Sequence, residues 1–342
     1  MKLKAHARKA GLCYARTDEG LELPVIDVTH PAFHIALDEG EQAALIERFL
    51  QDVGGPERLP AFLRGVLFRV MRRRSVIMRG LMGASGTFMS GMNTYLMKLG
   101  PDNLDQPFFG AVDRRLAGSP AGLSMRLRLQ DTAELLADAL LAPLAARPDA
   151  ALHLLNIGGG PAIDSLNALI LVQTKHPALL AGRPLYIHSL DVNTAGPHFG
   201  ARALAAILAE GPLRGLDVSF EHTDYDWSRP EELRLRIHTL VAGPQIVAMS
   251  SEGALFEYGS DQDILGNLQA LQEATPPDTV VAGSVTRADD LGRRLNGAGV
   301  GSRAAIHFRE WEAFAALAFR TGWAVAKRLD RPLSYDIRLR KA

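Results

Sequence analysis

The sequence has almost no cysteine, no net charge and no long hydrophobic run. Its one cysteine, Cys13, excludes an intrachain disulfide and a cysteine-rich metal site, and fits a reducing compartment. The 342 residues carry 38 Lys and Arg against 38 Asp and Glu, so no overall field attracts nucleic acid or an anionic membrane. No apolar run approaches the ~20 residues that a membrane span requires. We therefore expect a small-molecule partner, no nucleic acid and no membrane.

Two further absences bear on location and chemistry. The amino-terminal region contains no apolar block of the kind found in signal peptides, so we expect a cytoplasmic protein. The histidines are scattered singly and show no metal-ligand spacing, so we predict no bound metal. Hydrophobic residues nevertheless make up 47% of the chain, which is enough for a sizeable core.

The chain divides into two parts, residues 1–148 and residues 149–342. In the first part apolar residues recur at helical spacing, over residues 39–51, 60–71 and 123–144. In the second part short apolar runs alternate with helical patterns, which predicts a parallel sheet covered by helices on both faces. We predict strands over residues 152–157, 185–192, 217–224, 245–250 and 279–284. We predict helices over residues 162–174, 199–210, 230–240, 261–274 and 309–321. Two last extended runs, 323–329 and 334–340, predict an antiparallel hairpin.

The most informative stretch runs from Leu152 to Ser165. An apolar run breaks at Gly158, Gly159 and Gly160 and then resumes with helical spacing, so a strand, a tight turn and a helix follow one another. A ligand that lies against the backbone needs such a turn, because a Cβ would hold it off. The stretch lacks the third glycine of a dinucleotide site. Asp191 closes the next apolar run, and an acid there can accept hydrogen bonds from the two hydroxyls of a ribose.

This arrangement resembles the class I S-adenosylmethionine-dependent methyltransferases, over roughly residues 150–342. The resemblance implies an α/β fold with a Rossmann-like seven-stranded methyltransferase sheet, five parallel strands plus a C-terminal antiparallel hairpin. Residues 1–148 would add a helical N-terminal lid domain. The implied cofactor is S-adenosylmethionine. The resemblance implies that it is bound by Asn156, Gly158, Gly159, Gly160, Asp191, Val192, Asp224, Tyr225, Ser250 and Ser251.

Two of these positions have implied roles after the third strand. In the resembled family an acid here, Asp224, accepts from the adenine amino group, and a neighbouring aromatic, Tyr225, packs on the ring. Asp191 and Asp224 have an alternative role, because Asp after a strand is often a helix N-cap.

The candidate catalytic residues are Tyr95, Asn93 and Glu252. Tyr95 and Asn93 lie in Ser75–Leu104, a segment rich in methionine and glycine, which we interpret as a lid that presents polar groups to the pocket. The alternative is a tightly packed buried helix pair. Glu252 follows the fourth strand, where it would hold an amine or take its proton. Its alternative is a loop acid on the surface.

Three functions are compatible with these patterns. The first is methyl transfer to an O, N or C nucleophile of a small molecule, for which the protein must align the nucleophile and exclude water. The second is a cyclase of the azetidine-2-carboxylate synthase type, in which the cofactor's own amine closes a four-membered ring and methylthioadenosine is released. The third is a non-catalytic module that binds S-adenosylmethionine. A monomer or a homodimer fits each of them.

Overall fold

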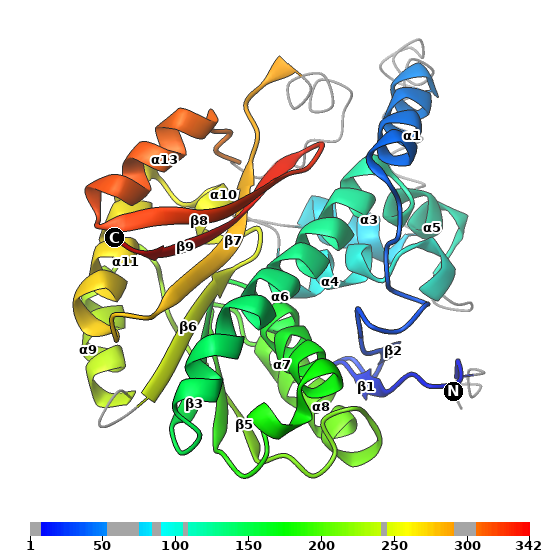
Figure 1. Ribbon diagram of the computed structural model, residues 1–342. Coiled ribbons are helices and arrows are strands. Elements are labelled where there is room, and N and C mark those ends of the chain that lie inside the picture. The colour runs from blue at the N-terminus through cyan, green and yellow to red at the C-terminus, as the bar shows by residue number, and fades with distance from the viewer. Residues whose placement is uncertain (1–7, 53–74, 84–89, 105–108, 241–244, 291–305) are drawn as a thin grey trace.

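A seven-stranded sheet flanked by helices forms the centre of the molecule (Figure 1). This computed structural model describes residues 8–52, 75–83, 90–104, 109–240, 245–290 and 306–342. The helix predicted over residues 60–71 and the middle of the predicted lid, residues 84–89, lie outside these ranges. Within them, no helix is long and apolar enough to cross a membrane.

The sheet has five parallel strands and an antiparallel hairpin, as predicted. The parallel strands are β3 (Ala151–Ile157), β4 (Leu185–Leu190), β5 (Val218–Thr223), β6 (Gln245–Ser251) and β7 (Val280–Thr286). The hairpin consists of β8 (Trp323–Asp330) and β9 (Ser334–Lys341). Their order across the sheet is β5-β4-β3-β6-β7-β9-β8. Because β3 lies at the point where this order reverses direction, the loops at its carboxyl end face a crevice.

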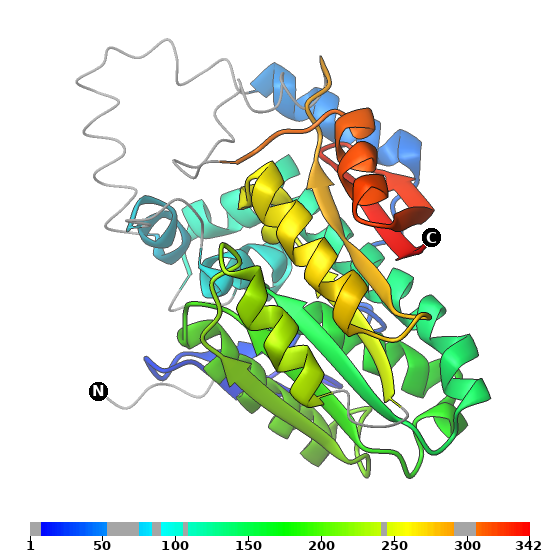
Figure 2. The same cartoon turned by 90° about the vertical axis from the view of Figure 1, so that its left-hand side faces the viewer.

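Side chains on both faces of the central strands are apolar, which is why both faces are covered. Leu152 and Leu154 belong to one core, and Leu155 and Ile157 belong to the other. The first face packs against α6 (Pro120–Ala146), α7 (Ile163–Lys175) and α8 (Ala195–Glu210). The second packs against α9 (Pro230–Leu240), α11 (Asp261–Ala274) and α13 (Trp311–Arg320) (Figures 1 and 2). A short helix, α10 (Leu255–Tyr258), follows β6.

The N-terminal part adds helices packed around α6 and two short strands beside α8. These are β1 (Tyr14–Arg16), β2 (Glu22–Pro24), α1 (Glu39–Asp52), α3 (Val76–Gly83), α4 (Gly91–Lys98) and α5 (Ala111–Ala117). One apolar core contains Leu23, Tyr95 and Leu129 together with Leu154 and Phe199. The predicted boundary near residue 148 falls between α6 and β3, and this core extends across it.

Helix α8 begins four residues earlier than predicted, at Ala195 instead of Phe199. The sequence pattern suggested a later start because Gly196 and Pro197 are poor helix formers. Proline is tolerated in the first helical turn, where its missing N–H has no intrahelical partner. Here the start of α8 lies directly beside the glycine turn, since a Cβ on Gly196 would stand 2.8 Å from the Gly160 Cα.

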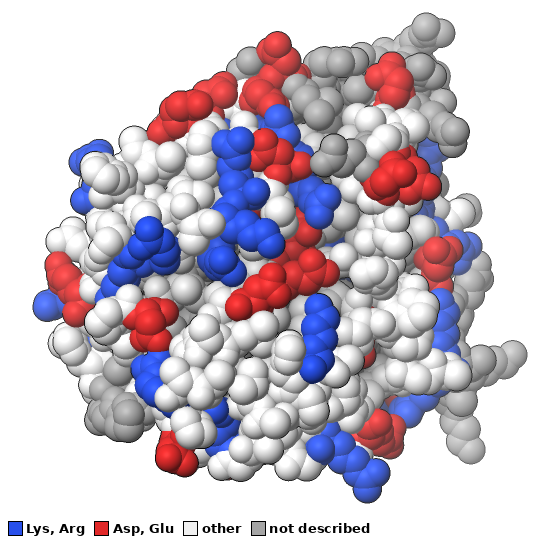
Figure 3. All heavy atoms as spheres, viewed as in Figure 1, with Lys and Arg blue, Asp and Glu red and all other residues white. Residues whose placement is uncertain are grey.

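Strand β8 forms one edge of the sheet and carries exposed positive charges. Lys327 and Arg328 are exposed on β8, and Arg340 is exposed on the adjacent strand β9. In the space-filling view, Lys and Arg gather over this hairpin (Figure 3). Charged side chains on an edge strand oppose its pairing with a strand of another molecule.

Candidate functional site

A pocket of about 540 Å³ opens where the carboxyl ends of the parallel strands meet the N-terminal helices. It is lined by Gly91, Gly158, residues 191–193, residues 225–228, Gly253, Ala254, Tyr258, Ser260, Asp263 and His307. Its volume lies in the range of small-molecule sites. Three of these lining residues are aspartates and none is Lys or Arg, so the wall favours a ligand that carries positive charge.

The glycine turn follows β3, as predicted, and Gly158 is the glycine that lines the pocket. Its φ is +68°, a conformation that side chains disfavour. A Cβ at this position would stand 2.7 Å from Trp227 Cζ3 and 2.8 Å from the Ala254 Cβ. Both of these residues line the pocket, so any side chain at position 158 would narrow it.

Gly159 and Gly160 were predicted to contact the ligand, but they are not in the pocket wall. A Cβ on Gly159 would collide with the amide of Asn156. A Cβ on Gly160 would stand 2.7 Å from the Gly91 Cα, at the start of α4. These two glycines are therefore needed for close packing beneath and beside the turn.

Asp191 is buried at the end of β4 and lines the pocket. Its side chain accepts hydrogen bonds from the backbone N–H of Gly160 at 2.9 Å and of Asn193 at 2.8 Å. Burial raises the pKa of the carboxyl, and these hydrogen bonds oppose the rise. The carboxylate thus connects the glycine turn to the loop after β4, where it can also accept from a ligand hydroxyl. Val192, the next residue, lines the pocket as well.

The loop after β5 contributes to the pocket through Tyr225, Asp226 and Trp227, and Asp224 does not. The Tyr225 hydroxyl donates to Asn267 Oδ1 on α11 at 2.6 Å, which anchors the loop on that helix. The structure therefore corrects the prediction for Asp224, which is exposed outside the pocket. The acid in the wall is Asp226, whose carboxylate accepts from the Ser228 N–H at 2.9 Å; this hydrogen bond lowers its pKa.

Asn156, Ser250 and Ser251 lie beneath the pocket and not in its wall. Asn156 Nδ2 donates to Asp164 Oδ1 at 2.7 Å and to Ser250 Oγ at 3.0 Å. Ser251 Oγ donates to the Ile157 carbonyl at 3.0 Å. Asn156 Oδ1 and Asp164 Oδ2 are buried without a hydrogen-bond partner among the described residues. Burial raises the pKa of Asp164 to about 6.

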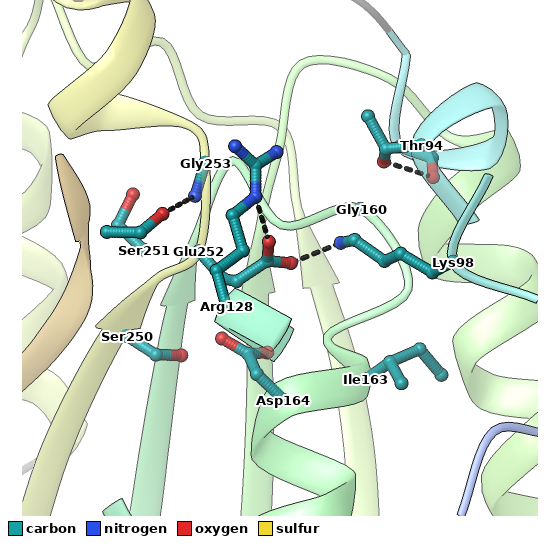
Figure 4. Close-up of polar contacts among 12 residues, drawn as sticks. Thr94, Lys98, Arg128, Gly160, Ile163, Asp164, Ser250, Ser251, Glu252 and Gly253 are labelled. Atoms are coloured by element: carbon teal, nitrogen blue, oxygen red, sulfur yellow. Dashed lines mark hydrogen bonds and ion pairs between the residues drawn. The ribbon is translucent and has the colours of Figure 1, made fainter. Parts of the chain in front are cut away.

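Glu252 belongs to a buried ionic network that joins the two parts of the chain (Figure 4). It pairs with Lys98 of α4 and accepts from Arg128 Nε of α6 at 2.6 Å. Arg128 Nη1 also donates to Glu257 Oε2 at 2.9 Å. Burial raises the pKa of Glu257, while Arg128 opposes the rise. Glu252 is 5% exposed and does not line the pocket. It is therefore not a surface acid, and its side chain does not face the space in which a methyl acceptor would bind.

The structure corrects the expectation that Tyr95 faces the pocket. Its hydroxyl donates to the Pro24 carbonyl at 2.7 Å and accepts from the Ile26 N–H at 3.2 Å, and its side chain is 1% exposed. Its ring packs on Phe199 with centroids 4.7 Å apart. The hydroxyl of Tyr95 has its hydrogen bonds satisfied by two backbone groups, and its ring packs in the apolar core. Tyr95 therefore holds residues 24–26 against α4.

Asn93 lies in the first turn of α4 and is half-buried, and it is not among the residues that line the pocket. Its backbone N–H donates to the N-cap side chain of Ser90. The N-terminal part reaches the pocket instead through Gly91, the first residue of α4. That the segment from Ser75 to Leu104 moves as a lid stays a prediction.

A second polar cluster, the histidine row, crosses four strands on the face that α9 covers. His153 Nδ1 lies 3.0 Å from His188 Nε2, and His153 Nε2 lies 3.2 Å from Gln245 Oε1. His188 Nδ1 lies 3.2 Å from Glu221 Oε2. Burial lowers the pKa of both histidines, that of His188 to about 4. The row is absent from the pocket wall.

Sequence reasoning missed Lys98, Arg128, Asp226 and Trp227. Lys98 and Arg128 are separated from Glu252 by 154 and 124 residues, so no local motif connects them. The available signal was a single charge within an otherwise apolar helical face, as in Tyr95-Leu96-Met97-Lys98-Leu99. A charge in such a position is rarely buried unless it is paired.

Comparison with known proteins supports the fold. No family model matches the chain, and a search of curated proteins finds no match. A possible exported protein from Bordetella parapertussis has a similar structure, with a TM-score of 0.56 and 14% identity over 91% of this chain and 99% of that one. Mitomycin 7-O-methyltransferase aligns with a TM-score of 0.42 and 16% identity, covering 90% of this chain and 74% of that one. Magnesium protoporphyrin IX methyltransferase from Synechocystis PCC 6803 aligns with a TM-score of 0.41 and 12% identity, covering 64% of this chain and 87% of that one.

At these identities the likeness concerns the fold alone. The chain has a Rossmann-like seven-stranded sheet, with the five parallel strands and the C-terminal antiparallel hairpin that were predicted.

Proposed function

We propose that this protein binds S-adenosylmethionine in the pocket and transfers its methyl group to an O, N or C nucleophile of a small molecule. The observation that carries the proposal is the position of Asp191, a buried carboxylate that lines the pocket at the end of β4 beside Gly158. A carboxylate there can accept from both hydroxyls of a ribose, and charge-assisted hydrogen bonds of this kind are strong.

The remaining wall suits the same ligand. Asp226 offers an acceptor for the adenine amino group, and Val192 and Tyr225 provide apolar surface for the ring. Gly158 leaves the backbone accessible beside Asp191 and Trp227. The cofactor carries a sulfonium and an ammonium group, and a wall with aspartates and without Lys or Arg is electrostatically matched to them.

When bound, the cofactor supplies an activated methyl group, so the protein's task is to orient an acceptor and exclude water. Two side chains of the wall, Tyr258 and His307, have hydroxyl and imidazole groups that can orient an acceptor or take its proton. Glu252 is engaged by Lys98 and Arg128 and therefore supports the wall from behind.

The test combines calorimetry with mass spectrometry. The purified protein should bind S-adenosylmethionine and S-adenosylhomocysteine, and with a metabolite extract as the source of acceptors it should form S-adenosylhomocysteine and a methylated product. Methylthioadenosine formed without an acceptor would instead establish the cyclase that makes azetidine-2-carboxylate. Binding without any product would establish a non-catalytic module. Absence of binding to both compounds would contradict the proposal.

A further inference from the structure

Arg128 reaches the pocket wall from behind and retains unused hydrogen-bonding capacity. It comes from α6, in the N-terminal part, and is 6% exposed. Nε donates to Glu252 at 2.6 Å and Nη1 donates to Glu257 at 2.9 Å. Among the described residues, Nη2 has no hydrogen-bond acceptor. This nitrogen therefore keeps donor capacity that none of the described residues uses.

The absence of a side chain on Gly253 explains how Arg128 Nη2 can reach a ligand in the pocket. It lines the pocket, its φ is +64°, and its N–H is held by Ser284 Oγ at 3.0 Å. A Cβ at position 253 would collide with Arg128 Nη2. The absence of a side chain therefore allows the guanidinium to lie directly against the wall, where Figure 4 shows it beside Gly253.

The chemistry of a guanidinium selects its ligand. Its two Nη2 hydrogens favour an anionic oxygen acceptor such as a carboxylate. None of the residues that line the pocket is Lys or Arg, so Arg128 would take this role from directly behind Gly253. The charges of Lys98 and Arg128 are balanced by those of Glu252 and Glu257, so a zwitterionic group can bind beside the network without changing its net charge.

We propose that Arg128, through Nη2, binds the carboxylate of a pocket ligand and makes the site selective for ligands that carry one. The inference rests on the proposed function for the identity of the ligand. Two sources share this chemistry, the methionyl carboxylate of the cofactor and a carboxylate of the acceptor. In either case an N-terminal helix contributes a binding residue to the pocket of the Rossmann-like part.

The decisive measurement compares S-adenosylhomocysteine with its analogue that lacks only the carboxylate group. In the wild-type protein we expect the complete compound to bind about 10- to 100-fold more tightly, the effect of one hydrogen-bonded charge pair. In Arg128→Lys, which keeps the charge near Glu252 and Glu257 but lacks Nη2, this ratio should fall to near one. The affinity for the analogue should stay unchanged.

Two further variants separate binding from folding. Gly253→Ala leaves Arg128 in the chain but displaces Nη2, so it should lower the same ratio. Lys98→Gln is the matched control, because it removes the other buried cation of the network and leaves Arg128 against Gly253. It should keep the ratio of the wild type. Thermal unfolding identifies any variant that fails to fold.

Titrating benzoate and acetate into protein saturated with S-adenosylhomocysteine tests whether the carboxylate that Arg128 binds belongs to the methyl acceptor. Binding to the wild type that is lost in Arg128→Lys, together with an unchanged affinity ratio, assigns the carboxylate to the acceptor. If neither the ratio nor carboxylate binding depends on Arg128, the inference is overturned while the proposed function stands. If the wild type binds neither S-adenosylhomocysteine nor the analogue, the proposed function itself fails.

Discussion

The polar groups at the carboxyl ends of the strands differ from the histidine row inside the sheet in how fully they are paired. At the carboxyl ends, Arg128 Nη2, Asn156 Oδ1 and Asp164 Oδ2 have no hydrogen-bond partner among the described residues. In the histidine row, three of the four ring nitrogens of His153 and His188 have a hydrogen-bond partner, and the fourth, His188 Nδ1, lies 3.2 Å from Glu221 Oε2 without forming a hydrogen bond.

Under the proposed function this difference has a consequence, because the ligand would bind at the carboxyl ends of the strands. A largely paired polar row contributes to the stability and register of the sheet, whereas unpaired groups under a pocket carry a free-energy cost that a ligand can offset. Changes at the carboxyl ends should therefore act on ligand binding, and changes in the core should act on folding. Three predictions separate the two regions.

The largest effect is expected for Asp191→Ala. Loss of the carboxylate removes the acceptor for ribose hydroxyls and for the Gly160 N–H, and we expect at least a tenfold loss of affinity for S-adenosylhomocysteine, about 1.5–3 kcal/mol. Isothermal titration calorimetry measures it. Asp224→Ala is the control, because this neighbouring strand-end acid is exposed and outside the pocket. Equal losses in the two variants would refute the assignment.

The next effect is on stability alone. Tyr95→Phe leaves the buried Pro24 carbonyl and Ile26 N–H without the hydroxyl, and should lower the free energy of unfolding by about 1–3 kcal/mol. Affinity for S-adenosylhomocysteine should remain that of the wild type. The matched control is Tyr186→Phe, whose hydroxyl has no hydrogen bond to the described residues. A folded Tyr95→Phe protein with reduced affinity would restore Tyr95 to the site.

The smallest effect depends on pH. Because burial lowers the pKa of His188 from 6.5 to about 4, the unfolded chain takes up a proton between these values before the folded protein does. The contribution of His188 to the free energy of unfolding should therefore fall as the pH is lowered from 6.5 toward 4, whereas buried carboxyls with a raised pKa, such as Asp164, contribute in the opposite direction. Urea unfolding across this range should show a smaller loss of stability with falling pH for His188→Gln than for the wild type. His198→Gln, at an exposed position on α8, should retain the wild-type slope.

The fold was largely predictable because its signals are local. Alternating apolar runs and the glycine turn after β3 are features of neighbouring residues, and so are the caps and breaks between elements. Gly158 and Asp191 were proposed from the same local signals and Val192 and Tyr225 from the family resemblance; all four line the pocket, because parallel strands bring their carboxyl ends to one edge, and their contact with a cofactor stays a prediction.

The other predictions for the site depended on long-range contacts, which one sequence does not reveal. Arg128 meets Glu252 across 124 residues, and Tyr95 meets Ile26 across 69. A tyrosine beside small polar residues has the same local pattern whether it faces a ligand or the core. Asp224 and Asp226 are two residues apart on one loop, so their spacing alone does not tell which of them lines the pocket. The hydrogen bond between Tyr225 and Asn267 fixes the loop so that Asp226 lies in the wall.

The shared core has a consequence for the order of events during synthesis. Leu23, Tyr95 and Leu129 emerge from the ribosome before Leu154 and Phe199, against which the same core is completed. The apolar faces of the early helices must therefore remain uncovered until the central strands have been translated. Contacts of such high sequence separation slow folding and leave apolar surface exposed in the interval, so the stretch of synthesis before β3 forms is when the nascent chain can aggregate.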